Sequence, residues 1–257
     1  MFDSPVAVGG IVVALVLGAG ALPLVLRLSP RVLHGVVAAA CGLFLGITFL
    51  HLLPELGERA RAAGGRAPAL WASVLAGLLA VFLADVLLRA REEELHEGDH
   101  PAHHGGHRVV GIATFVGLSI HTLGGAIGIG LGFEDEAWRS TLVAATLAHK
   151  AAEAFSLVSV LLLAELARRT TLALLAAYAL VTPAGIVAGR LLARGIAPDL
   201  LGPAEGLAAG TFLYVAVAEL LPEVFHGRAD RGLKVVLLFA GIAASTLLLL
   251  HPENHAP

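Results

Sequence analysis

Long apolar stretches, each bounded by charged residues, glycine or proline, follow one another along the chain. They are continuous rather than alternating, and each approaches the length of about 20 residues that a helix needs to cross a bilayer. Strands of a membrane barrel would alternate and would be about half as long. The pattern predicts membrane-spanning helices at 6–26, 32–54, 69–89, 109–132, 140–165, 171–193, 203–225 and 233–251. The predicted fold class is an all-α membrane protein, a single domain over 1–257 with eight transmembrane helices.

Composition supports this prediction and excludes other classes. Hydrophobic residues make up 57% of the 257 positions and charged residues 14%, with a net charge of −3. A soluble domain of this size could not bury so much apolar surface in one core. The basic region that precedes a cleavable signal peptide is not seen before the first apolar stretch. We therefore expect a lipid bilayer as a partner and no nucleic acid.

The distribution of basic residues predicts the orientation. Ten Lys and Arg residues lie in the odd-numbered loops and six in the even-numbered loops, and Lys150 lies within a span, which accounts for all 17. Cytoplasmic loops carry the excess of positive charge. We expect both termini outside and the long loop at 90–108 in the cytoplasm.

Spans two and seven share a sequence pattern. The sequence Leu-Leu-Pro-Glu ends span two at 52–55 and span seven at 220–223, a separation of 168 residues. At the same separation Gly42 matches Gly210, and His51 falls opposite Glu219. Because the two spans cross the membrane in opposite directions, the match predicts a 3+2+3 inverted repeat around spans four and five. Such repeats are an architecture of secondary transporters. The alternative is a chance similarity of two leucine-rich helices.

Ionisable residues within spans four and five are the strongest candidates for function, because such groups are costly in a bilayer. His149 and Glu153 are four residues apart on span five and therefore share a helix face. His121 on span four offers a third ligand for a first-row divalent cation. The alternative is a buried His149–Glu153 pair with a hydrogen-bonded His121. Lys150 either pairs with an acid or stands where a second cation would otherwise bind.

Several further residues are weaker candidates for a metal pathway. Glu55 and Glu223 follow the two repeated prolines and could be vestibule ligands at opposite faces, and His226 favours the cytoplasmic mouth. The long loop is either a flexible linker or a loose metal-binding tract. Its histidines are His96, His100, His103, His104 and His107.

A set of motifs connects the chain to a known family. The sequence His-Leu-Leu-Pro-Glu at 51–55, Gly-Thr-Phe-Leu-Tyr-Val at 210–215 and His-Lys-Ala-Ala-Glu-Ala at 149–154 accompany eight spans and a histidine-rich loop between spans three and four. In this combination the chain resembles the ZIP (Zrt-/Irt-like) divalent metal transporters over essentially its whole length. The His-Lys form of span five is similar to one branch of that family.

The resemblance implies a 3+2+3 inverted repeat, a homodimer, and a transport site between spans four and five. His121 matches the span-four histidine of the family, and His149 and Glu153 match its span-five ligands. The chain departs from the family at other ligand positions. Thr122 and Gly125 stand where many members have an asparagine and a carboxylate, Lys150 replaces a second-site ligand, and Thr182 stands where some members place a further carboxylate. The resemblance thus implies one metal site with the second lost, for which His51, Glu219 or Glu223 could compensate.

The sequence therefore predicts an importer of divalent metal in the plasma or inner cell membrane, with zinc first and iron or manganese next. The cation would be held by His121, His149 and Glu153 and would leave past Glu219 and Glu223. We expect no enzymatic activity and no cofactor besides the transported metal, since no P-loop or His-Glu-x-x-His motif is found in the sequence. A transport-deficient metal sensor or structural membrane protein, suggested by Gly125, is the alternative.

Overall fold

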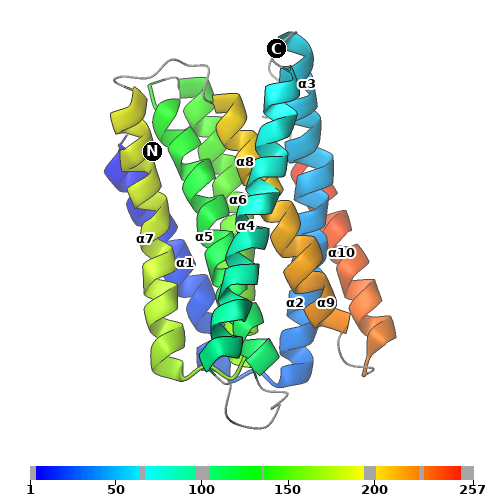
Figure 1. The fold of residues 1–257 in the computed structure, drawn as a ribbon. Helices are drawn as coiled ribbons and strands as arrows, with labels where there is room; N and C mark the ends of the chain where they lie inside the picture. The colour runs from blue at the N-terminus through cyan, green and yellow to red at the C-terminus, as the bar shows by residue number, and fades with distance from the viewer. Residues whose placement is uncertain are drawn as a thin grey trace.

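A computed structural model describes residues 4–63, 67–95, 105–134, 136–193, 201–225 and 229–249. Five of the predicted candidates lie outside these ranges, namely His96, His100, His103, His104 and His226. Over the described residues all regular structure is helical, as Figure 1 shows, which confirms the all-α fold class.

The helices follow the predicted apolar stretches in order. They are α1 (Pro5–Leu26), α2 (Pro30–Ile47), η1 (Thr48–Leu52), α3 (Leu53–Ala63), α4 (Ala67–Leu95), α5 (Gly105–Leu131), α6 (Glu136–Leu163), α7 (Arg168–Ala193), α8 (Leu201–Tyr214), η4 (Val215–Leu220), α9 (Leu221–Phe225) and α10 (Arg231–Leu249). Within the described residues, seven helical stretches are long and apolar enough to cross a membrane. The helix α10 lies on the eighth predicted stretch and is not among these seven.

The predicted loop at 90–108 is shorter than the hydropathy pattern indicates. The helix α4 continues to Leu95, and α5 already begins at Gly105 with His107 in its first turn. The sequence after the apolar part of α4 is rich in arginine and glutamate, which are good helix formers. Helix formation therefore continues beyond the apolar stretch, because hydropathy marks the membrane boundary and not the helix end.

Two π-helical segments interrupt the helices that share the repeated sequence. The segments η1 and η4 each lie directly before the repeated Leu-Pro, so that Pro54 and Pro222 begin the α-helical turns that follow. A proline inside a helix has no N–H for the carbonyl four residues earlier, and its ring collides with that carbonyl. A wider π turn accommodates the proline without ending the helix.

The long helices form two groups, and glycines allow close packing in both. One group consists of α1, α5, α6 and α7; the other contains α2 against α10 and α4 against α8 (Figure 1). In the second group, a side chain would collide with a backbone carbonyl of the facing helix at Gly42 on α2, Gly241 on α10, Gly77 on α4 and Gly210 on α8. In the first group the same holds for Gly130 on α5 and Gly189 on α7. Small residues at such positions let membrane helices approach closely.

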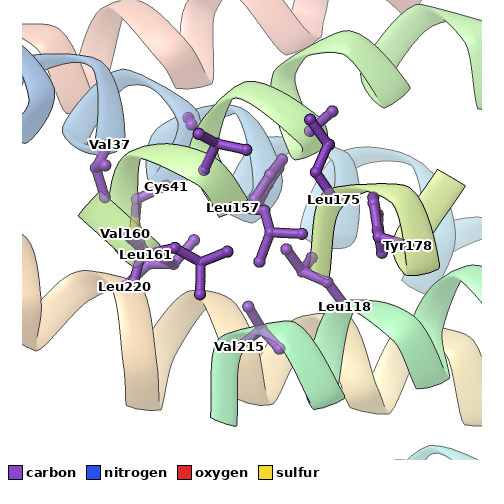
Figure 2. Packing of buried hydrophobic residues seen from close by; sticks show 14 of the residues in the cluster. Val37, Cys41, Leu118, Leu157, Val160, Leu161, Leu175, Tyr178, Val215 and Leu220 are labelled. Carbon is purple, nitrogen blue, oxygen red and sulfur yellow. The ribbon is translucent and has the colours of Figure 1, made fainter. Parts of the chain in front are cut away.

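The apolar core lies between the two groups. Figure 2 shows that side chains from α2, α5, α6, α7 and η4 converge there, among them Cys41, Leu118, Leu157 and Val215. All four are almost fully buried. This core occupies the side of the bundle toward the N-terminal half of α5 and the C-terminal half of α6. The candidate site lies at its edge.

Candidate metal-binding site

His121, His149 and Glu153 lie together between α5 and α6. The Nε2 atoms of His121 and His149 are 3.3 and 3.4 Å from Oε1 of Glu153, and the three ligand atoms lie within 4.8 Å of one another. Glu153 is fully buried, and its Oε1 accepts no hydrogen bond. Within the part of the chain that the structure describes, this is the group of histidine and acidic side chains arranged to hold a metal ion.

The orientation of His121 is set by two neighbours on α8. Its Nδ1 lies 3.0 Å from the carbonyl oxygen of Ala208, so Nδ1 carries the proton and donates it. The Nε2 atom, which faces Glu153, then carries the lone pair that a metal ligand needs. Phe212 stacks on the imidazole with 4.0 Å between the ring centroids and 22° between the planes. In the neutral imidazole, Nε2 and Oε1 of Glu153 could therefore both act as ligands of a cation placed between them.

The second oxygen of Glu153 belongs to a separate hydrogen-bond network. Oε2 accepts from Nζ of Lys150 at 2.6 Å and from the hydroxyl of Tyr178 at 2.6 Å. The Lys150 ammonium also donates to Oγ1 of Thr122 at 2.6 Å and to the Tyr178 hydroxyl at 3.1 Å. Lys150 and Tyr178 are both buried, so this ion pair is shielded from lipid. The network satisfies the charge that a buried lysine would otherwise leave unpaired.

A cavity of about 130 Å³ adjoins the cluster on one side. His121, His149, Lys150 and Thr182 line its inner end, and the exposed Glu55 of α3 lines it further out. The remaining lining residues are Leu52, Thr122, Gly124, Gly125, Ala126, Gly128, Leu142, Thr146 and Ala208. A Cβ atom at Gly125 or Gly128 would meet nothing within 4 Å. The glycines of α5 therefore leave open space beside the ligands.

The opposite side of the cluster is closed. The residues one turn beyond the ligands, Leu118 on α5 and Leu157 on α6, are fully buried in the apolar core. Phe212, stacked on His121, packs in turn against Phe44 of α2 with 4.7 Å between the ring centroids. The cluster is thus reached from the cavity side and blocked by apolar side chains on the other.

The accessory candidates are placed in different surroundings. His51 lies in η1 with Nε2 3.2 Å from the carbonyl oxygen of Ser245 on α10, so it is turned toward α10. Glu219 and Glu223, on η4 and α9, are buried on the closed side. Glu55 lies on the open side, and Thr122 and Lys150 lie within the network around Glu153. The structure thus joins His121, His149, Glu153, Lys150 and Thr122, and separates them from His51.

Tyr178 is the site residue that the sequence analysis missed. It comes from α7, and its hydroxyl bonds to Glu153 and lies 2.9 Å from Oγ1 of Thr122. The available signal was its rarity: the chain has two tyrosines, and this one lies in mid-span, one turn before Thr182. A buried tyrosine hydroxyl normally has a polar partner.

The ligand set fits a transition-metal dication. Two imidazole nitrogens and one carboxylate oxygen are the donors that zinc takes, at about 2.0–2.2 Å. Tetrahedral ligands at that distance are separated by roughly 3.3 Å, which matches the two measured separations. Three protein ligands leave a fourth position, which the cavity supplies with space. The fold and the cluster together define a multi-pass helical membrane protein with a buried group of side chains that could hold a metal ion.

Comparison with known proteins identifies the family. The sequence model described as ZIP zinc transporter matches residues 89–249, more than half of the chain and all of the cluster. The chain therefore belongs to the ZIP family. Zinc transporter ZIP1 from Homo sapiens and from Bos taurus are each 37% identical over 135 residues, which cover 51% of this chain and 41% of theirs. Protein zntD from Dictyostelium discoideum is 29% identical over 142 residues, 52% of this chain and 20% of its own length. The chain thus matches less than half the length of each of these relatives.

Proposed function

We propose that this protein transports divalent metal, with zinc as its first substrate, through a single site formed by His121, His149 and Glu153. The observation that carries the proposal is the convergence of the two Nε2 atoms on Oε1 of Glu153 at 3.3 and 3.4 Å. The names of the ZIP1 relatives support zinc as the substrate. Iron and manganese are the next candidates. The alternative is a sensor that binds metal without transporting it.

The proposed direction is inward, from the cavity side to the closed side. The excess of basic residues in the odd-numbered loops supports an outside location for Glu55, the cavity and both termini. In a plasma or inner membrane, inward movement of a dication through 100 mV contributes about 4.6 kcal/mol (2 × 2.3). Uptake could then proceed without ATP, past Glu219 and Glu223 and the cytoplasmic histidine loop.

The proposed mechanism is alternating access built on a 3+2+3 inverted repeat within one domain, residues 1–257. The equivalent positions of η1 and η4 support the repeat, as does the equivalent packing of α2 on α10 and of α8 on α4. In such transporters the site lies at the repeat interface, and one helix group moves against the other. The group of α1, α5, α6 and α7 carries all three ligands and Tyr178.

Lys150 determines the number of metal ions in this proposal. Its ammonium occupies the position beside Oε2 of Glu153 at which a second cation would need a ligand. We infer one metal ion per chain, consistent with the resemblance to the His-Lys branch of the family. We also infer a homodimer, on the same resemblance.

The test is zinc uptake by the purified protein in vesicles, comparing wild type with Glu153→Gln. The amide preserves the shape of the side chain but removes the charge that stabilises a dication in a buried site. We expect flux to fall to near background and equilibrium zinc binding to fall with it. Glu153→Gln also leaves the buried Lys150 ammonium without its carboxylate, so uptake is measured in parallel in Lys150→Met/Glu153→Gln, which removes both charges and should still insert.

The control is Glu165→Gln, which removes an exposed carboxylate after α6 and should transport like wild type. Transport by Glu153→Gln at a rate near that of wild type would reject the site. Stoichiometric zinc binding by wild type without any flux would favour the sensor instead.

A further inference from the structure

The two oxygens of Glu153 have different and fixed environments. Oε1 faces the imidazoles of His121 and His149, whereas Oε2 faces Lys150 and Tyr178. A carboxylate that is free to rotate can bind a metal through one oxygen or through both. Here the number of oxygens that reach the metal depends on what holds Oε2.

The hydrogen-bond network around Oε2 accounts for every proton that its members carry. The three protons of the Lys150 ammonium have acceptors on Thr122, Glu153 and Tyr178. Tyr178 has one proton, which it donates to Oε2 at 2.6 Å. Thr122 must therefore be the donor in its 2.9 Å contact with the Tyr178 hydroxyl. Turning Oε2 toward a metal would break two charge-assisted hydrogen bonds whose donors, Lys150 and Tyr178, are buried.

Tyr178 is the rigid member of this network. Lys150 reaches Oε2 through a flexible four-carbon chain and lies three residues from Glu153 on the same helix, so it can move with the carboxylate. Tyr178 comes from α7, is fully buried, and has its ring 4.9 Å from the Lys150 ammonium. Its hydroxyl therefore fixes Oε2 relative to a third helix.

We propose that Tyr178 is a positioning residue that restricts Glu153 to a single metal-binding oxygen and thereby favours zinc over manganese. The inference rests on the proposed function of the cluster. Two nitrogens, one oxygen and one water give the four-coordinate geometry of zinc. Manganese takes about six ligands, rich in oxygen. If Glu153 binds the metal through one oxygen only, manganese lacks the second carboxylate oxygen that it could otherwise take as a ligand.

The test is metal binding to the purified full-length protein, with Co²⁺ as the spectroscopic probe and Zn²⁺ and Mn²⁺ as competitors. Tyr178→Phe keeps the ring and removes the hydroxyl. We expect the ratio of zinc to manganese affinity to fall about tenfold, the effect of losing one hydrogen bond to a charged group. We also expect the visible Co²⁺ bands to weaken, because the intensity falls as the coordination number rises above four.

The other tyrosine of the chain provides a matched control. Tyr214 donates its hydroxyl to Oδ2 of Asp85 at 3.2 Å, away from the cluster, so Tyr214→Phe should leave the spectrum and the affinity ratio unchanged. Thr122→Val removes the proton donated to Tyr178. It should lower the zinc-to-manganese affinity ratio and weaken the Co²⁺ bands, each by less than Tyr178→Phe does. It tests the proposal independently of whether Tyr178→Phe folds.

The outcomes separate the two proposals. Wild-type protein that binds none of the three metals would reject the site itself. Wild-type binding, with an unchanged spectrum and affinity ratio in Tyr178→Phe or in Thr122→Val, would reject the role of Tyr178 alone. A loss of thermal stability in these variants, with the spectrum and the affinity ratio unchanged, would show that the hydroxyl only stabilises the helix packing. That outcome would also reject the positioning role of Tyr178.

Discussion

The end of span two and the end of span seven have the same four residues and opposite surroundings. In both, a π-helical segment leads into Leu-Leu-Pro-Glu. On α3, Glu55 is exposed and lines the cavity, and Leu52 before it is only partly buried. On α9, Glu223 is 7% exposed, and Leu220 before it is completely buried in the apolar core.

The difference shows that the molecule is open on one side of the cluster and closed on the other. The closed end contacts α10 and the turn before it. Lys234 of α10 donates to the carbonyl oxygen of Val224 at 2.8 Å, and Asp230 in the turn pairs with Arg31 of α2 at 2.7 Å. If the two ends are structural equivalents, the opposite state would expose Glu223 and Leu220 and bury Glu55 and Leu52. The following predictions test this comparison.

Filling the open side should have the largest effect. Gly128→Leu places a side chain in the cavity, where a Cβ atom meets nothing within 4 Å, so the fold should tolerate it. We expect zinc uptake by reconstituted protein to fall to near background, because the cavity is the path to the ligands. Gly18→Leu, at an exposed and equally open position on α1, is the control and should transport normally. Normal uptake by Gly128→Leu would show that metal reaches the cluster by another route.

Chemical accessibility should distinguish the two ends directly. The native cysteine, Cys41, is buried, so a new cysteine can be labelled selectively. Glu55→Cys should react with a water-soluble maleimide at least roughly tenfold faster than Glu223→Cys, because a thiolate must be reached by the reagent. The measurement is the labelling rate by mass spectrometry. Equal rates would mean that the two ends do not differ in exposure.

The loss of stability on overpacking should differ least between the two regions. Gly42→Ala on α2 and Gly210→Ala on α8 each force a methyl group against a backbone carbonyl, of Leu238 and Val74 respectively. We expect each to lower stability by about 1–3 kcal/mol, as overpacking does, and by similar amounts. Thermal unfolding in detergent measures this loss. Gly57→Ala has open space at its Cβ and should stabilise α3 slightly. A large loss at one site and none at the other would contradict the equivalence of the regions.

Much of the site could be predicted because its signals are local. His149 and Glu153 share a helix face in any tertiary arrangement. A charged group within an apolar span is energetically costly, so it can be recognised in the sequence as a functional candidate. The position of His121 opposite them was expected from the motif, and the structure brings it within 3.3 Å of Glu153. His51 carries an equally strong local signal, yet its ring faces Ser245 on α10. Which way a polar side chain turns depends on the neighbouring helix, and hydropathy contains no information about neighbours.

The sequence by itself determined the helical fold class and the order of the spans, because both depend on the composition of continuous stretches. It also determined the family, because the family is carried by local motifs such as those at 51–55 and 149–154. Only the tertiary structure decided that Tyr178 reaches Glu153 from α7, since that contact joins residues 25 apart on different helices. The tertiary structure also decided which end of the molecule is open. Residues 52–55 and 220–223 are identical in sequence, so their different exposure arises from packing against the helices around them.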